Sequence, residues 1–178
     1  RPVSRLDRDT SGIILFALNS FIQYSLVSQM HDNSFTREYI GLVHGILTEN
    51  SGSISLPIKR LPGSTMLRHV SPDGLKAITH YEVLERFSDV SFLKFSIVTG
   101  RTHQIRVHCQ AIGHPLICDT LYPLPAFEGR YENLMSRHAL HAQRCVFTHP
   151  LTKKVIELKA PIPYDFSNAL EILRNKQL

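Results

Sequence analysis

The sequence predicts an α+β fold with a mixed, mainly antiparallel sheet and flanking helices and loops. Strand-like segments come in neighbouring pairs, at 77–85 with 90–98 and at 139–147 with 154–160. Consecutive strands joined by short turns pair antiparallel. Helix-like segments are few and lie outside these pairs, which is typical of α+β rather than of alternating α/β proteins.

Composition limits the class of protein. The length of 178 residues fits one well-buried domain, which we place at 1–178. No apolar run approaches the roughly 20 residues that span a membrane, so we expect no membrane association. We also expect a monomer. Twenty Lys and Arg against 15 Asp and Glu give a net charge of +5, which favours a polyanionic partner. Three cysteines in unlike contexts favour a cytoplasmic protein over a disulfide-bonded one.

Three helices are predicted from apolar spacing and end signals. They cover 21–30, 101–112 and 167–175, and Asn19 or Ser20 provides an N-cap for the first. Gly100 precedes the second helix, whose apolar residues recur at helical spacing.

Further strands are predicted at 13–17, as a short buried strand, and at 36–43. Segment 48–76 contains repeated Pro and Gly and several cations, which indicates short strands and loops with a basic surface.

The segment from Ser4 to Gly12, SRLDRDTSG, carries the first candidate for chemistry. Asp7 lies in a polar turn beside arginines and directly before an apolar run. A carboxylate in this place suits nucleophilic or acid–base work on a polyanion, although an aspartate in a turn is most often only a turn former. The spacing alone leaves the two interpretations open.

Five ordered segments resemble motifs of the RluA-type RNA pseudouridine synthases. The family patterns are RLDxxTSG, KxYxAxVxG, GRTHQIRxH, GHPxxGDxxY, and RxxLHA with HPxT. They correspond here to 4–12, 37–45, 100–108, 113–122, and 137–142 with 149–152. The first and third patterns are specific, and the segments together span nearly the whole chain.

The resemblance implies a pseudouridine synthase fold with a central RNA-binding cleft. It implies an isomerase that converts specific uridines of ribosomal or transfer RNA to pseudouridine, with RNA as partner and no metal, nucleotide or other cofactor. Relatives place strands before the RLD motif, so we expect this sequence to be an N-terminally truncated catalytic domain.

The resemblance also assigns catalytic roles. Asp7 matches the catalytic aspartate and is the expected nucleophile, whereas Asp9 serves the turn. Tyr39 is expected to stack on the target uracil and to take part in proton transfer at C5. Arg101 matches the arginine expected to form an ion pair with the aspartate, since a nearby guanidinium favours the ionised carboxylate.

RNA contacts are expected from a second group of residues. Arg5 is expected to occupy the space that a flipped uridine leaves, because flipping costs a few kcal/mol of stacking and pairing. Ile105 is a candidate apolar wall for the base, with core packing as the equal alternative. Donors to phosphate or ribose are expected from His103, Gln104 and Arg106, and from the loop cations Lys59, Arg60 and Arg68.

Two alternatives to this function are a metal-dependent enzyme and an RNA-binding module without turnover. His103, His108, Cys109, His114 and Cys118 cluster in sequence, but their spacings match no tight zinc-ligand pair, so we expect no metal site. A metal-dependent deaminase or nuclease would need an HxE…PCxxC pattern or an acidic cluster, which the sequence lacks. An RNA-binding module without turnover would have no need for the catalytic set.

Four positions depart from the family pattern. Ser4, Gly41, Cys118 and Pro123 stand where His, Ala, Gly and Gly are common. Of these, Cys118 puts the turn before Asp119 in question.

Overall fold

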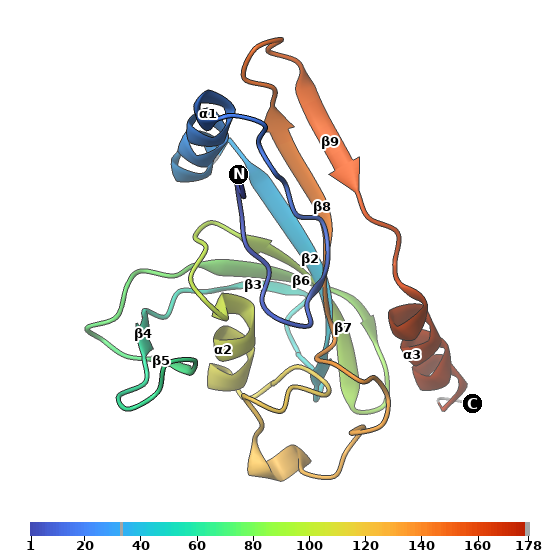
Figure 1. Cartoon of the computed structure of the whole chain (residues 1–178). Coiled ribbons are helices and arrows are strands. Elements are labelled where there is room, and N and C mark those ends of the chain that lie inside the picture. Colours follow the sequence, from blue (N-terminus) through green and yellow to red (C-terminus); the bar gives the residue numbers. More distant parts are fainter. Residues whose placement is uncertain (33, 177–178) are drawn as a thin grey trace.

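The computed structural model describes residues 1–32 and 34–176, and its centre is a mixed, mainly antiparallel sheet. Within that part of the chain seven strands pair in the order β1-β8-β2-β7-β6-β3, and β9 pairs with β8 (Figure 1). The pairing of β1 with β8 is parallel and the other pairs are antiparallel. The strands are β1 (Ser11–Gly12), β2 (Thr36–His44), β3 (Ser51–Ile54), β6 (Thr79–Arg86), β7 (Val90–Ile97), β8 (Leu140–Thr148) and β9 (Val155–Lys159).

A separate two-stranded hairpin, β4 (Ile58–Arg60) with β5 (Arg68–Val70), stands beside the sheet. The helices are α1 (Ser20–His31), α2 (Gln104–Ala111) and α3 (Tyr164–Asn175), with a short 3₁₀ turn, η1 (Pro125–Phe127). None of the helices in the described residues is long and apolar enough to cross a membrane.

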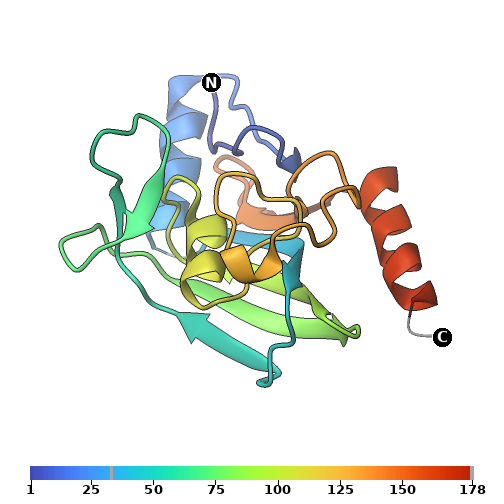
Figure 2. The ribbon, with the colours of Figure 1, turned by 90° about the horizontal axis from the view of Figure 1, so that it is seen from below.

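Strand β2 separates the two main core layers, because alternate side chains of a strand face opposite sides. Ile40 and Leu42 belong to the cluster that packs on α3. Val43 and the partly buried Tyr39 belong to the cluster that packs on α2. Helices α2 and α3 therefore cover opposite faces of the sheet, and Figure 2 shows them on either side of the strands.

A third cluster joins α1 to the far end of β2 and β8. Leu26 of α1 packs with Phe35, Cys145 and Phe147, and the Phe35 and Phe147 rings stack at 5.3 Å. Asn19 caps α1, since its Oδ1 accepts a hydrogen bond of 2.9 Å from the Ile22 amide. The N-terminal segment lies along this same cluster, which also includes Val3 and Ala17.

The structure confirms the α+β class and most of the predicted elements. The predicted hairpins correspond to β6–β7 and β8–β9, and each predicted helix is present with ends shifted by one to three residues. Segment 48–76 contains the short strands β3, β4 and β5. Helix α2 starts at Gln104 rather than at 101, because residues 101–103 form a turn that ends at His103 with φ +57°.

The prediction of a buried strand at 13–17 is wrong. Ser11–Gly12 pairs with β8 and the Ile13 amide donates to Ala142 O, whereas residues 15–17 pair with the first three residues of the chain. The Val3 amide donates to Leu15 O at 2.9 Å, and Phe16 is 65% exposed. An apolar run of this length does not distinguish a central strand from an extended segment at the surface.

The N-terminal segment approaches the sheet closely at Gly12. We therefore expect Gly12→Ala to be strongly destabilising. A Cβ there would lie 2.1 Å from Ala142 O, and the residue has φ +116°. We expect a loss of about 3 kcal/mol or more in the free energy of unfolding, measured by urea denaturation.

Gly63→Ala is the matched control, because Gly63 has φ +76° and nothing within 4 Å of an added Cβ. It should cost only the strain of a left-handed alanine, about 1–2 kcal/mol. Equal losses in the two variants would contradict the close approach at Gly12.

Candidate active site

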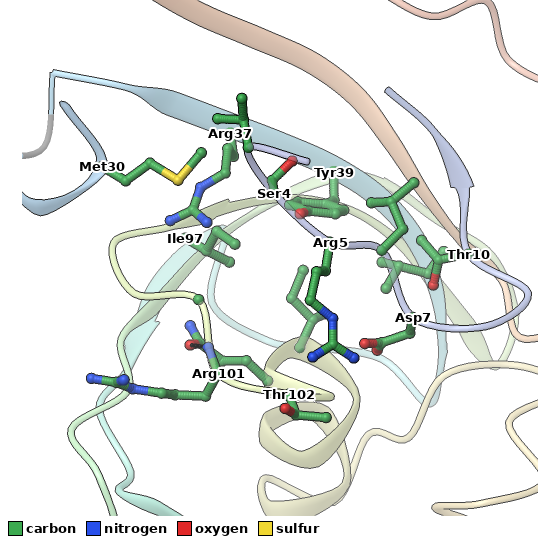
Figure 3. A pocket seen from close by; sticks show the side chains of 16 residues that line it. Ser4, Arg5, Asp7, Thr10, Met30, Arg37, Tyr39, Ile97, Arg101 and Thr102 are labelled. Atoms are coloured by element: carbon green, nitrogen blue, oxygen red, sulfur yellow. Dashed lines mark hydrogen bonds between the residues drawn. The ribbon is translucent and has the colours of Figure 1, made fainter. Parts of the chain in front are cut away.

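A pocket of about 280 Å³ opens between the N-terminal segment and the α2 face of the sheet (Figure 3). Segment 3–7 and Thr10 form one side, and β2 contributes Arg37 and Tyr39. Residues 100–102 and the first turn of α2 form the floor. The pocket thus gathers parts of four motifs that lie far apart in the chain, since Leu140 of the RxxLHA motif also lines it.

Asp7 lies in this pocket with its side chain 23% exposed, and Asp9 does not line it. The Thr10 amide donates to Asp7 O at 3.1 Å, which closes a turn between them. Asp9 takes φ +70° in this turn, and its side chain is 60% exposed. This geometry agrees with a turn-forming role for Asp9.

Two histidines of the RxxLHA motif hold the segment after Asp7. Thr10 Oγ1 shares a hydrogen bond of 2.7 Å with His138 Nε2, and Ser11 Oγ shares one of 2.8 Å with His141 Nδ1. Burial and then the nearby Arg106 charge lower the pKa of His138 to about 4, and burial lowers that of His141. Both rings are therefore neutral near pH 7 and act as fixed hydrogen-bond partners.

Arg137 of the same motif fixes the turn from the other side. Its Nη1 donates to Asp9 O at 3.3 Å and to Leu140 O at 2.9 Å. Its Nε and Nη2 form a two-pronged ion pair with Asp165 of α3, at 2.8 and 3.1 Å. The RxxLHA motif alone is a weak sequence signal. Its anchoring role was not predicted, because residues 137–141 meet residues 9–11 only in the folded sheet.

Arg106 is the cation next to Asp7. It is 4% exposed and binds the fully buried Asp119 carboxylate through Nε and Nη2, at 2.7 Å each. Its remaining Nη1 lies 3.9 Å from Asp7 Oδ2. A guanidinium held in this way stabilises the ionised form of a nearby carboxylate.

The structure does not place Arg101 in the ion pair that was predicted for it. Arg101 is exposed at the pocket rim, and its Nε donates to Lys76 O at 3.0 Å. Among the described residues the ion-pair partner of Asp7 is Arg106. The reason is geometric, since residues 101–103 precede α2 while Arg106 lies on the helix face that is turned toward Asp7.

Tyr39 forms the wall of the pocket on β2, and Ile105 is buried on the opposite side. Burial raises the pKa of the Tyr39 phenol; Asp7 raises it further, and Arg37 opposes both. The phenol is therefore protonated at neutral pH. The ring offers an aromatic face to whatever enters the pocket.

Gln104 was predicted to donate to RNA, and its surroundings do not leave it free to do so. It is 4% exposed, and its amide nitrogen donates to Ile78 O and Thr79 Oγ1 at 2.9 and 3.0 Å. Its oxygen accepts from the Arg101 amide at 3.0 Å. The side chain fastens the start of α2 to the start of β6, and Arg106 is likewise bonded inside the protein rather than available to phosphate.

His103 and the predicted loop cations lie outside the pocket, whereas Arg5 and Ile105 line it. His103 bonds through Nδ1 to Tyr122 Oη at 2.7 Å, and this hydroxyl accepts from the Arg68 amide at 3.0 Å. Lys59 is paired with Asp73, and the Arg68 guanidinium donates to backbone carbonyls of its own loop. None of the three predicted loop cations lines the pocket. Their role in RNA binding stays a prediction.

The Cys and His cluster does not form a metal site in residues 1–32 and 34–176. His108 is buried between Thr79 Oγ1 and Leu56 O, at 2.9 Å each. His114 bonds to His44 O at 2.8 Å. Cys109 is buried in the core.

Sequence reasoning also missed Arg37, which lines the pocket beside Tyr39. The signal was available, because residues two apart on a strand share a face. Gly100 lies beside it, since a Cβ there would be 2.8 Å from Arg37 Nη1.

We expect Asp119→Asn to be strongly destabilising, because it leaves the buried Arg106 charge without its counter-charge. Breaking a buried ion pair at one partner costs about 3–5 kcal/mol. Replacing both partners together, as Arg106→Met with Asp119→Leu, should restore most of the loss. Calorimetric unfolding of the three variants is the measurement, and a double variant as unstable as Asp119→Asn would contradict the buried-charge explanation.

The chain matches the family model described as RNA pseudouridylate synthase over residues 1–111. It is 41% identical over 169 residues to the uncharacterized RNA pseudouridine synthase YjbO of Bacillus subtilis, covering 95% of this chain and 58% of the relative. It is 39% identical over 181 residues to ribosomal large subunit pseudouridine synthase D of Haemophilus ducreyi, covering 97% and 55%. The chain therefore spans little more than half the length of these relatives.

The fold is also similar to solved structures. The structure of human RNA pseudouridylate synthase domain containing 1 superposes with a TM-score of 0.76 at 30% identity, over 92% of this chain and 69% of the other. That of human RNA pseudouridylate synthase domain containing 4 has a TM-score of 0.78 at 19% identity, a likeness of fold. With Asp7 and Tyr39 gathered at one pocket, Arg106 beside Asp7, and the family model matching more than half of the chain, the protein belongs to the RNA pseudouridylate synthase family.

Proposed function

We propose that this chain is the catalytic domain of an isomerase that converts specific uridines in RNA to pseudouridine, with Asp7 as nucleophile. The observation that carries the proposal is the position of the Asp7 carboxylate, open to the pocket and 3.9 Å from the buried Arg106 guanidinium. The names of several relatives refer to the ribosomal large subunit, which supports ribosomal RNA as the substrate ahead of transfer RNA. The proposal includes a cytoplasmic monomer that needs no metal or nucleotide cofactor.

The reaction rearranges bonds without a net change in atoms or oxidation state. The C1′–N1 bond of uridine breaks, the uracil turns in place, C1′ bonds to C5, the C5 proton leaves, and N1 takes up a proton. A detached base must be retained during the turn, and an aromatic face such as Tyr39 holds a flipped base by about 1–3 kcal/mol. Attack of Asp7 on C1′ and attack on the uracil ring are both compatible with its position.

Tyr39 is assigned stacking first and proton removal second. Its raised pKa keeps the phenol protonated, so it accepts the C5 proton only if its own proton moves on in the same step. The charge of the Asp7 carboxylate acts on this phenol, so Asp7 is the acceptor expected for the phenol proton. The two residues are therefore expected to act as a pair after C–C bond formation.

We expect Asp7→Asn to abolish pseudouridine formation while leaving folding and RNA affinity nearly unchanged. The amide has the same shape but is a far poorer nucleophile, and affinity depends chiefly on phosphate contacts. Asp9→Asn is the matched control, because Asp9 does not line the pocket, and it should retain most activity. Release of tritium from [5-³H]uridine-labelled total RNA gives the rate. An essential Asp9 with a dispensable Asp7 would overturn the assignment.

Arg5 lines the pocket and is directed toward Asp7 in Figure 3, so Arg5→Ala should reduce the rate more than the affinity. Loss of a group that fills the space of the flipped nucleotide should lower the single-turnover rate at saturating RNA by roughly tenfold or more. The comparison is a triple Lys59, Arg60 and Arg68 to Gln variant, which should lose affinity and salt dependence but keep the saturated rate. Wild-type rates at saturation in both variants would show that Arg5 is only a further phosphate contact.

A further inference from the structure

Arg37 is a cation in the pocket that has no partner in the described residues. It projects from β2 two residues before Tyr39, on the same face of the strand. Its Nε is buried without a hydrogen-bond partner. No carboxylate in residues 1–32 and 34–176 lies within 4 Å of its guanidinium.

The Arg37 guanidinium lies beside Gly100, since a Cβ at position 100 would be 2.8 Å from Nη1. In Figure 3 the guanidinium points past Ile97 toward the side of the pocket where Arg101 stands, away from Asp7. Its free N–H groups are thus presented to the pocket rather than to the body of the sheet.

Arg144 on the adjacent strand β8 contrasts with Arg37, because it is paired with two carboxylates. Arg144 bonds to Glu38 and to Glu157, at 2.8 Å each. An arginine held in a partly buried position without such partners loses hydration with no compensation in the protein. Burial lowers the pKa of Arg37 for this reason, although the group stays charged at neutral pH.

We propose that Arg37 is a binding site for a backbone phosphate of the RNA strand next to the nucleotide held over Tyr39. A phosphate supplies a full negative charge and two oxygens at the spacing of a guanidinium fork, which a neutral uracil carbonyl does not. This inference rests on the proposed function, because it takes RNA as the ligand. It places a strand contact across the pocket from Asp7.

The test uses the full chain with Arg37→Met, which keeps the apolar stem and removes the charge. Arg37→Lys keeps the charge without the fork, and Arg144→Met is the matched control for loss of one arginine outside the pocket. Binding of fluorescein-labelled single-stranded decauridylate is measured by anisotropy at KCl concentrations from roughly 50 to 200 mM. All variants also carry Asp7→Asn, so that binding is measured without turnover.

We expect Arg37→Met to weaken binding about tenfold at low salt and to lower the slope of log affinity against log salt by about 0.7, the value for one phosphate contact in a single strand. Arg37→Lys should keep the slope, and Arg144→Met should keep both slope and affinity. The melting temperature of Arg37→Met should equal or exceed that of the wild type, because an unpaired charge is removed.

Three outcomes would overturn the inference. One is an unchanged salt slope in a folded Arg37→Met variant, and another is an equal slope change in Arg144→Met. The third is a variant with Asp7 intact in which Arg37→Met lowers only the saturated rate, since the contact would then be to the reacting base. If Arg37→Met changes the salt slope as expected but the wild-type chain forms no pseudouridine, the proposed function is rejected and the phosphate site still stands.

Discussion

The site depends on one buried guanidinium, that of Arg106. A charge in this position is stable only with a counter-charge, and the fully buried Asp119 supplies it with two hydrogen bonds of 2.7 Å. Those bonds fix the plane of the guanidinium and leave Nη1 directed at Asp7, 3.9 Å away. The guanidinium therefore faces the Asp7 carboxylate without a direct hydrogen bond to it, and Asp7 stays open to the pocket.

Three residues with left-handed backbone conformations adjoin the segments that carry this ion pair and Asp7. Asp9, His103 and Cys118 have φ of +70°, +57° and +59°, and each adjoins a functional segment. Asp9 lies two residues after Asp7, His103 directly precedes the helix that carries Arg106, and Cys118 directly precedes Asp119. Left-handed conformations cost non-glycine residues about 1–2 kcal/mol each. Cys118 shows that a residue other than the usual glycine is tolerated there, because the two bonds to Arg106 hold the turn after it.

Much of the fold could be predicted from the sequence, since long periodic segments have enough apolar contacts to define themselves. The β6–β7 hairpin and helix α1 are examples, with ends within a residue or two. Segment 13–17 could not be predicted, because residues 15–17 pair with the first three residues rather than with the sheet. Pairing across distant parts of the chain has no local signal.

The candidate site divides in the same way. Asp7 and Tyr39 were found because each lies in a recognisable motif, and the structure brings them to one pocket. Arg101 and Arg106 were interchanged, since both belong to one motif and only the start of α2 at Gln104 decides which of them turns toward Asp7. The role of Arg137 depends on a contact with Asp9 across 128 residues, which no spacing rule contains.

The arginines around the pocket fall into two groups with different physical roles. Arg106 and Arg137 are paired with carboxylates, and they hold the nucleophile segment in place. Arg5, Arg37 and Arg101 line the pocket and have no carboxylate within ion-pair distance among the described residues. Electrostatic balance in the pocket is therefore reached only when an anion enters. Because Arg37 stands apart from the Arg106–Asp119 pair, the proposed phosphate contact and the proposed chemistry of Asp7 involve different residues, and we expect Arg37 to be replaceable without loss of that pair.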